Sequence, residues 1–214
     1  MIKTQDVPRE LRTFNSLFNK LCYRHDVSTI FDDFLTLFIC CFARGTQEPW
    51  YFETIKRYKK EEITTFAHMM GDLIIRYHNA FLANDWIDPL GEYYEILAGN
   101  YKKSRLGQFF TPKSICDVMS GLTLQGADWD NKINDCACGS GRLLLSANRT
   151  TKDMYHIGQD LDMICAKMAA INLCMHQMKG EIHCMNSITM TAPRKSFLIN
   201  PKFHEHKTLL IICK

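Results

Sequence analysis

A glycine-rich segment holds the residues of this chain that are best suited to bind a ligand. It reads Asp-Cys-Ala-Cys-Gly-Ser-Gly over residues 135–141. Gly139 and Gly141 lack a Cβ, so the backbone can turn sharply and approach a ligand closely. The helix expected to follow presents unpaired N–H groups and the positive end of its dipole. Asp135 can accept a hydrogen bond from a ligand amine or hydroxyl, and together these features predict a nucleotide-like ligand.

The spacing of the two glycines is not specific by itself. It lacks the third glycine of a dinucleotide-binding fingerprint and the Gly-Lys-Ser/Thr of a phosphate-binding loop, so an ordinary tight turn explains it equally well. A second acid, Asp160, follows the next expected strand about 20 residues on, where doubly wound folds bind ribose hydroxyls. Asp162 is the better N-cap for the helix after it. Two acids are therefore available for two roles.

The elements that must position these residues begin with helices. Through the first hundred residues, apolar side chains recur at helical spacing and glycines are few. The predicted helices cover residues 29–43, 51–82 and 89–99. We expect a break in the second near Gly71, and in the third a start at Pro89 and a C-terminal cap at Gly99. The basic run over residues 56–60 is better explained as a solvated helix face than as a DNA contact.

After residue 100 the pattern changes to an alternation of strands and helices. The predicted strands cover residues 132–134, 155–159, 181–184, 196–199 and 208–213. The predicted helices cover residues 113–124, 142–148 and 163–178. This alternation argues for a mostly parallel, doubly wound sheet. The predicted fold class is therefore an α/β domain over residues 101–214, preceded by an all-α domain over residues 1–100.

Composition excludes some classes of protein and leaves others open. The net charge of +3 permits a polyanionic partner but does not argue for nucleic acid. The ten cysteines include no CxxC pair, which predicts a reduced, cytoplasmic protein. Residues 29–43 form the most apolar stretch, which is too short to span a bilayer. His204 and His206 with the distant Cys213 do not match a tetrahedral metal set, so no metal site is predicted.

Four segments, in this order along the chain, resemble the adenine-N6 DNA methyltransferases, and within them the modification subunits of type I restriction systems. The segments are Gly107–Pro112, Asp135–Gly141, Gly158–Asp162 and Met185–Ile188. The resemblance covers roughly residues 100–200 and implies S-adenosylmethionine as cofactor on a Rossmann-like methyltransferase core. Cys136 stands where the family usually has proline.

The resemblance also implies a role for each segment. Phe110 and Thr111 would cover the methionyl end of the cofactor, Asp160 would bind its ribose, and Asn186 would lie beside its adenine ring. The candidate cofactor residues are Phe110, Thr111, Asp135, Ala137, Gly139, Gly141, Asp160 and Asn186.

The catalytic motif of the family is Asn-Pro-Pro-Tyr/Phe, which holds and stacks the flipped adenine. This chain has Asn-Pro-Lys-Phe over residues 200–203. Asn200, Pro201 and Phe203 are therefore the candidate catalytic residues. Lys202 departs from the motif and brings a charge to the place where the base would stack. A degenerate catalytic motif and a chance occurrence both remain open.

Residues 142–214 are too few for a complete seven-stranded sheet and a region that reads DNA, so we expect a partial core and DNA recognition through a partner subunit. A homo-oligomer is also open. The leading hypothesis is an adenine-N6 DNA methyltransferase or the methylating subunit of a restriction-modification complex. The alternative is a catalytically impaired S-adenosylmethionine-binding module that acts as partner or regulator on a mobile element. A weaker third hypothesis is methylation of a small molecule or a protein.

Overall fold

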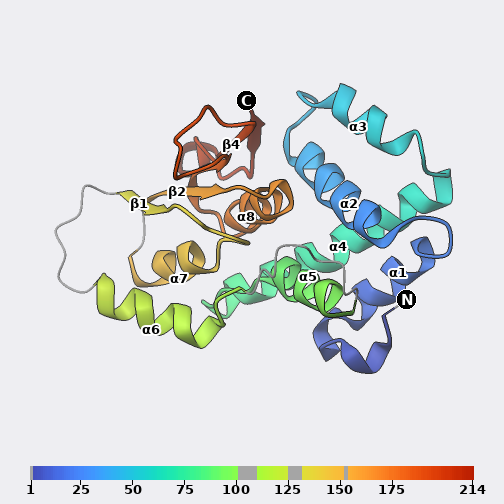
Figure 1. The fold of residues 1–214 in the computed structure, drawn as a ribbon, viewed down its shortest axis with the longest axis horizontal. Helices are drawn as coiled ribbons and strands as arrows, with labels where there is room; N and C mark the ends of the chain where they lie inside the picture. Colours follow the sequence, from blue (N-terminus) through green and yellow to red (C-terminus); the bar gives the residue numbers. More distant parts are fainter. Residues whose placement is uncertain (1, 101–109, 125–131, 152–153) are drawn as a thin grey trace.

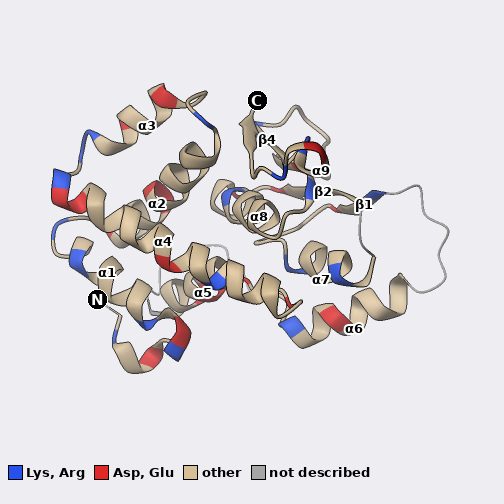
Figure 2. Cartoon of the chain, turned by 180° about the vertical axis from the view of Figure 1, so that it is seen from behind, with Lys and Arg blue, Asp and Glu red and all other residues tan. Residues whose placement is uncertain are grey.

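A computed structural model describes residues 2–100, 110–124, 132–151 and 154–214. The helices of the first hundred residues lie on one side of the molecule, and the sheet with its helices lies on the other (Figure 1). Basic and acidic residues are spread along the helices of both halves (Figure 2), in keeping with the small net charge. None of the helices in the described ranges is long and apolar enough to cross a membrane.

The first half consists of helices packed around aromatic side chains. Its helices are α1 Arg12–Leu21, α2 Val27–Phe42, α3 Glu48–Ile55, α4 Lys60–Leu82 and α5 Pro89–Asn100, after two short 3₁₀ turns at Thr4–Asp6 and Arg9–Leu11. Asp26 caps α2 by accepting from the N–H groups of Ser28 and Thr29. The rings of Phe14 and Tyr93 meet edge-on at 4.8 Å between centroids. This core joins α1 to α5, at the boundary with the second half.

Several predicted helix limits differ from the observed ones, and the largest difference is a break in the second helix. The helix expected over 51–82 breaks at residues 56–59 and not at Gly71, which lies inside α4. The Glu62 side chain accepts from the Lys59 N–H at 2.7 Å, and this cap starts a new helix. One glycine costs a helix only about 1 kcal/mol, which the buried face of α4 offsets. Helix α5 runs through Gly99 to Asn100.

The second half is a five-stranded sheet with helices. The strands are β1 Lys132–Asp135, β2 Tyr155–Asp160, β3 Lys179–Cys184, β4 Lys195–Ile199 and β5 Ile211–Cys213, in the spatial order β1-β2-β3-β4-β5. The helices are α6 Lys113–Thr123, α7 Arg142–Thr150, α8 Met163–Met175 and α9 Phe203–His206. The alternation of strands and helices predicted after residue 100 is confirmed.

The direction of β4 departs from the expected mostly parallel sheet, because this strand runs antiparallel to both of its neighbours. Strands β1, β2 and β3 are parallel, whereas β4 runs antiparallel to β3, and β5 antiparallel to β4. A parallel neighbour needs a crossover of a dozen or more residues, usually with a helix. Residues 185–194 form a shorter connection without a helix, so the chain turns back along the edge of β3.

Helix α8 is the centre of the molecule. It packs against β2 and β3 on one side and against α2 on the other. Every residue from Cys165 to Met175 is buried, which explains why apolar side chains occur on all sides of this helix. Even Lys167 is buried, and its Nζ donates to Asp32 Oδ1 at 2.6 Å in the first half. The two halves therefore share one continuous core, and a domain boundary at residue 100 stays a prediction.

A matched pair of glycine substitutions tests this packing. A Cβ on Gly91 of α5 would overlap Asp88 Oδ2 and lie 2.7 Å from Ser140 Oγ, whereas one on Gly71 of α4 meets nothing within 4 Å. We expect Gly91→Ala to lower the free energy of unfolding by about 2 kcal/mol through overpacking. Gly71→Ala should raise it by up to about 1 kcal/mol. Urea unfolding measures both, and equal effects would contradict the packing of α5 on the glycine loop.

Candidate functional site

The carboxyl ends of β1, β2 and β3 meet at one edge of the sheet and bring the candidate ligand-binding loops together. The N–H of Cys138, after β1, donates to the Gln159 carbonyl of β2 at 2.9 Å. The hydroxyl of Ser187, after β3, donates to the Cys136 carbonyl at 2.7 Å. The segments around Asp135, Asp160 and Asn186 are therefore neighbours, as the sequence led us to expect.

Glycine is needed at positions 139 and 141 for different structural reasons. Both have positive φ angles, +53° at Gly139 and +92° at Gly141, which other residues rarely adopt. A Cβ on Gly139 would lie 2.9 Å from the ring of Phe110. A Cβ on Gly141 would lie 3.2 Å from Leu173 Cδ1 of α8. Gly139 thus lets the loop approach Phe110, and Gly141 lets the start of α7 approach α8.

Asp160 holds the loop in place. Its Oδ2 accepts from the Gly139 N–H at 2.9 Å, and its Oδ1 accepts from the Asp162 N–H at 2.8 Å. Each carboxylate oxygen can accept two hydrogen bonds, so Asp160 retains acceptor capacity for ligand hydroxyls. Asp162 caps α8 by accepting from the Ile164 N–H at 2.8 Å, and its predicted role as N-cap is confirmed.

Asp135 and Asn186 complete this edge of the sheet. Asp135 Oδ1 accepts from the Ala137 N–H at 3.1 Å. Asn186 Oδ1 accepts from the N–H groups of Ile188 and Thr189 at 3.0 and 3.2 Å and shapes the turn after β3. Burial raises the pKa of Asp135 above its ordinary value, and the nearby charge of Asp160 acts in the same direction. Burial likewise raises the pKa of Asp160.

A cavity of about 70 Å³ opens at the loop. Its lining residues are Phe110, Thr111, Asp135, Ala137, Cys138, Gly139, Ser140, Arg142 and Leu143. This volume is well below the roughly 300 Å³ at which small-molecule pockets begin, so the cavity would hold one end of an elongated ligand, with the rest along the strand ends. These residues fit S-adenosylmethionine. The carboxylates can bind its ammonium and its ribose hydroxyls, and the glycines let the ligand approach the backbone closely. Gly107, Gln108 and Phe109 lie outside the described residues.

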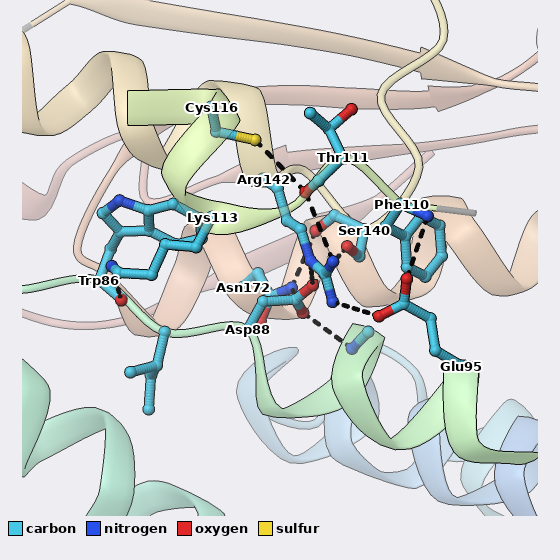
Figure 3. Close-up of polar contacts among 12 residues, drawn as sticks. Trp86, Asp88, Glu95, Phe110, Thr111, Lys113, Cys116, Ser140, Arg142 and Asn172 are labelled. Carbon is cyan, nitrogen blue, oxygen red and sulfur yellow. Dashed lines mark hydrogen bonds and ion pairs between the residues drawn. The ribbon is translucent and has the colours of Figure 1, made fainter. Parts of the chain in front are cut away.

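A buried carboxylate that sequence reasoning missed supports the loop from below (Figure 3). Asp88, between α4 and α5, is fully buried. Its Oδ2 accepts from Arg142 Nε and from Ser140 Oγ, each at 2.6 Å. Its Oδ1 accepts from the Gly91 N–H and from Asn172 Nδ2, each at 2.8 Å. One acid of the helical half thus binds the glycine loop, α7 and α8.

Arg142 extends the network toward the wall of the cavity. Its Nη2 donates to Glu95 Oε2 at 2.8 Å, and its Nη1 donates to the Thr111 carbonyl at 3.4 Å. The sequence did carry a signal, because an arginine in the first turn of a helix opposes the helix dipole and calls for a nearby acid. Nothing in the sequence indicates that this acid is Asp88, which precedes Pro89 and reads as an ordinary helix start.

The structure does not bring Asn200, Pro201 and Phe203 to the glycine loop. Because β4 is antiparallel to β3, residue 200 lies beside the amino end of β3. That strand has six residues, so its ends are roughly 16 Å apart at about 3.3 Å per residue. Phe203 instead lines a second cavity of about 360 Å³, together with residues of α4, of α7 and of the segments that follow α4 and α8.

The buried amide of Asn200 is fully engaged in the fold. Its Nδ2 donates to the carbonyls of Cys174 and Met178, each at 3.0 Å. Its Oδ1 accepts from the Leu210 N–H at 2.8 Å. These bonds join the end of α8 to the segment before β5. In this arrangement the amide has a structural task far from the loop.

A glycine loop with acids at the carboxyl ends of parallel strands is the arrangement with which doubly wound α/β domains bind nucleotide-like ligands. Residues 85–209, more than half of the chain, match the family described as N-6 DNA Methylase, and the chain belongs to this family.

Two relatives of known name are methylase subunits of type I restriction enzymes. The type I restriction enzyme MpnII methylase subunit of Mycoplasma pneumoniae is 27% identical over 114 residues, which are 49% of this chain and 21% of that protein. The MjaVII methylase subunit of Methanocaldococcus jannaschii is 26% identical over 121 residues, 53% of this chain and 21% of that protein. The chain thus spans about a fifth of the length of these relatives.

A solved structure is also similar. It is the methyltransferase subunit of a type I restriction-modification system from Streptococcus thermophilus, with a TM-score of 0.45 and 20% identity. The similarity covers 85% of this chain and 41% of that chain.

Within the ranges that the structure describes, no three His, Cys, Asp or Glu side chains gather to hold a metal ion.

The raised pKa values of Asp135 and Asp160 predict a pH dependence of ligand binding. An ionised carboxylate pairs with an ammonium and accepts from hydroxyls more strongly than a neutral carboxyl does, and both groups take up protons at a higher pH than a free aspartate. Affinity for S-adenosylmethionine is therefore full above these pKa values and falls as the pH drops through them. Calorimetry from about pH 7.5 to about pH 4.5 should show this loss, with a shallower dependence for Asp160→Asn. A constant affinity of the folded chain would contradict the assignment.

Proposed function

We propose that the chain binds S-adenosylmethionine at the carboxyl ends of β1, β2 and β3, as the cofactor-binding part of an adenine-N6 DNA methyltransferase. The observation that carries this proposal is the closure of the Gly139 loop by Asp160 within the region that matches the N-6 DNA methylase family. A ligand placed there meets two carboxylates, the start of α7 and a backbone without Cβ atoms at the turn.

Each candidate residue has a task toward the cofactor. Asp160 binds the ribose hydroxyls, and Asp135 accepts from the methionyl ammonium. Phe110 and Thr111 cover the methionyl end, with Ala137 and the glycines below it. Asn186 lies beside the adenine. The bound cofactor supplies an activated methyl group on a sulfonium, and the residues of this chain orient it and restrict its contact with water.

The similarity to two type I methylase subunits favours a role as the methylating subunit of a complex of the type I restriction-modification kind. In such a complex DNA is the substrate, and a partner subunit reads its sequence. A cytoplasmic location and a second copy of the chain in the complex belong to the same proposal. The small net charge fits DNA binding that depends mainly on other subunits.

A second candidate function is a cofactor-binding module that does not transfer the methyl group by itself. The position of Asn200 favours it, because this amide bonds to Cys174, Met178 and Leu210 at the opposite end of the sheet. A flipped adenine held there would lie roughly 16 Å from the loop. Direct transfer of a methyl group needs the reacting atoms within about 3.5 Å.

Calorimetric titration with S-adenosylmethionine tests the cofactor proposal. We expect micromolar binding that Asp160→Ala weakens at least tenfold, about 1.4 kcal/mol. The matched control is Asp72→Ala, because Asp72 lies on α4 and pairs with Arg76 away from the loop. Absence of binding by a chain with native circular dichroism would refute both candidate functions.

Transfer of a labelled methyl group to adenine-containing DNA separates the two candidates. From the position of residues 200–203 we expect the isolated chain to bind the cofactor and to transfer no methyl group. Phe203→Ala is the informative variant, because it leaves the hydrogen bonds of Asn200 in place. Methylation by the isolated chain that Phe203→Ala abolishes would overturn this expectation and establish the active methyltransferase.

A further inference from the structure

The carboxylate of Glu95 joins two walls of the candidate cofactor cavity without lining it. Its Oε1 accepts from the Phe110 N–H at 3.2 Å, and its Oε2 accepts from Arg142 Nη2 at 2.8 Å. Phe110 and Arg142 both line the cavity, and Glu95 does not. Figure 3 shows the carboxylate between these two groups.

Phe110 is held on several sides. Its ring lies so close to the loop that a Cβ on Gly139 would be 2.9 Å away. The Arg142 guanidinium carbon lies 5.3 Å from the ring centroid, and the ring of Tyr94 lies at 5.9 Å between centroids. The backbone of Phe110 is fixed by the bond to Glu95. Glu95 therefore sets where the aromatic wall stands relative to the loop.

The anchor behind Glu95 is rigid. Arg142 binds the fully buried Asp88 through its Nε at 2.6 Å, which leaves Nη2 directed at Glu95. The exposed fraction of the side chain is 2% for Asp88 but 32% for Glu95. Loss of Asp88 would strand a buried cation and unfold the loop, whereas loss of Glu95 leaves that pair intact. Glu95 can therefore be changed without removing the support of the loop.

We propose that Glu95 is a positioning residue for the methionyl end of S-adenosylmethionine and acts through Phe110 and Arg142. This inference rests on the proposed cofactor function. The wall that Glu95 holds is the one predicted to cover the amino-acid part of the ligand, whereas Asp160 serves the ribose. Glu95 should therefore affect ligands that carry the amino-acid part and spare ligands that lack it.

Two ligands separate this role from a general structural one. S-adenosylhomocysteine has the amino-acid part, and 5′-methylthioadenosine has the same adenosine and thioether without it. By calorimetry we expect Glu95→Ala to weaken S-adenosylhomocysteine binding about tenfold, as for loss of a charged hydrogen bond. Binding of 5′-methylthioadenosine should change by less than about twofold. Glu95→Gln, which keeps an oxygen to accept from the Phe110 N–H, should recover part of the loss.

Control variants distinguish failure of the positioning role from failure of the cofactor proposal. Asp72→Ala removes a carboxylate of α4 that pairs with Arg76, and it should leave both affinities unchanged. Asp160→Ala should weaken both ligands. Equal weakening of both ligands by Glu95→Ala, or no weakening, would overturn the positioning role. Binding of neither ligand by the unsubstituted chain would refute the cofactor proposal itself. Should Glu95→Ala fail to fold, Glu95→Gln provides the test: the positioning role requires a larger loss of affinity for S-adenosylhomocysteine than for 5′-methylthioadenosine.

Discussion

The position of the glycine loop depends on one buried carboxylate, that of Asp88. Removing a carboxylate from water is costly unless it is paired and hydrogen-bonded, and Asp88 has both kinds of partner. Burial raises its pKa, while the guanidinium of Arg142 acts in the opposite direction. Because Asp88 belongs to the helical half and Arg142, Ser140 and Asn172 to the sheet half, the charge can be satisfied only when the halves dock.

This requirement explains why the helical half is part of the site. Helix α8 needs a second layer over its outer face, and α2 supplies it. Asn172 of α8 donates to Asp88 and to the Ser140 carbonyl, and accepts from the Tyr77 hydroxyl at 2.6 Å. One side chain thus joins α4, α8 and the glycine loop. The helices of the first half act as the scaffold that holds the loop for its ligand.

The two ends of the sheet have separate tasks in this chain. The carboxyl ends of β1, β2 and β3 carry the acids and glycines, whereas the amino end of β3 carries the Asn200 clamp. The two ends are separated because β4 runs antiparallel to β3, so that β4 ends beside the start of β3. The residues that follow β4 therefore lie at the amino end of β3. If β4 were parallel to β3, residues 200–203 would follow it at the carboxyl end of the sheet, on the side of the glycine loop. Strand direction therefore decides what this motif can do.

The sequence by itself determined the local features of the protein: the turn at Gly139 and Gly141, the cap at Asp162, the acid at Asp160 and the alternation of strands and helices. These depend on a few consecutive residues and their backbone preferences. Only the tertiary structure decided that Asp88 pairs with Arg142, that α4 begins at Lys60, and that Asn200 faces away from the loop. Those outcomes depend on contacts between residues far apart in the chain, where burial of charge and the direction of a neighbouring strand outweigh local pattern.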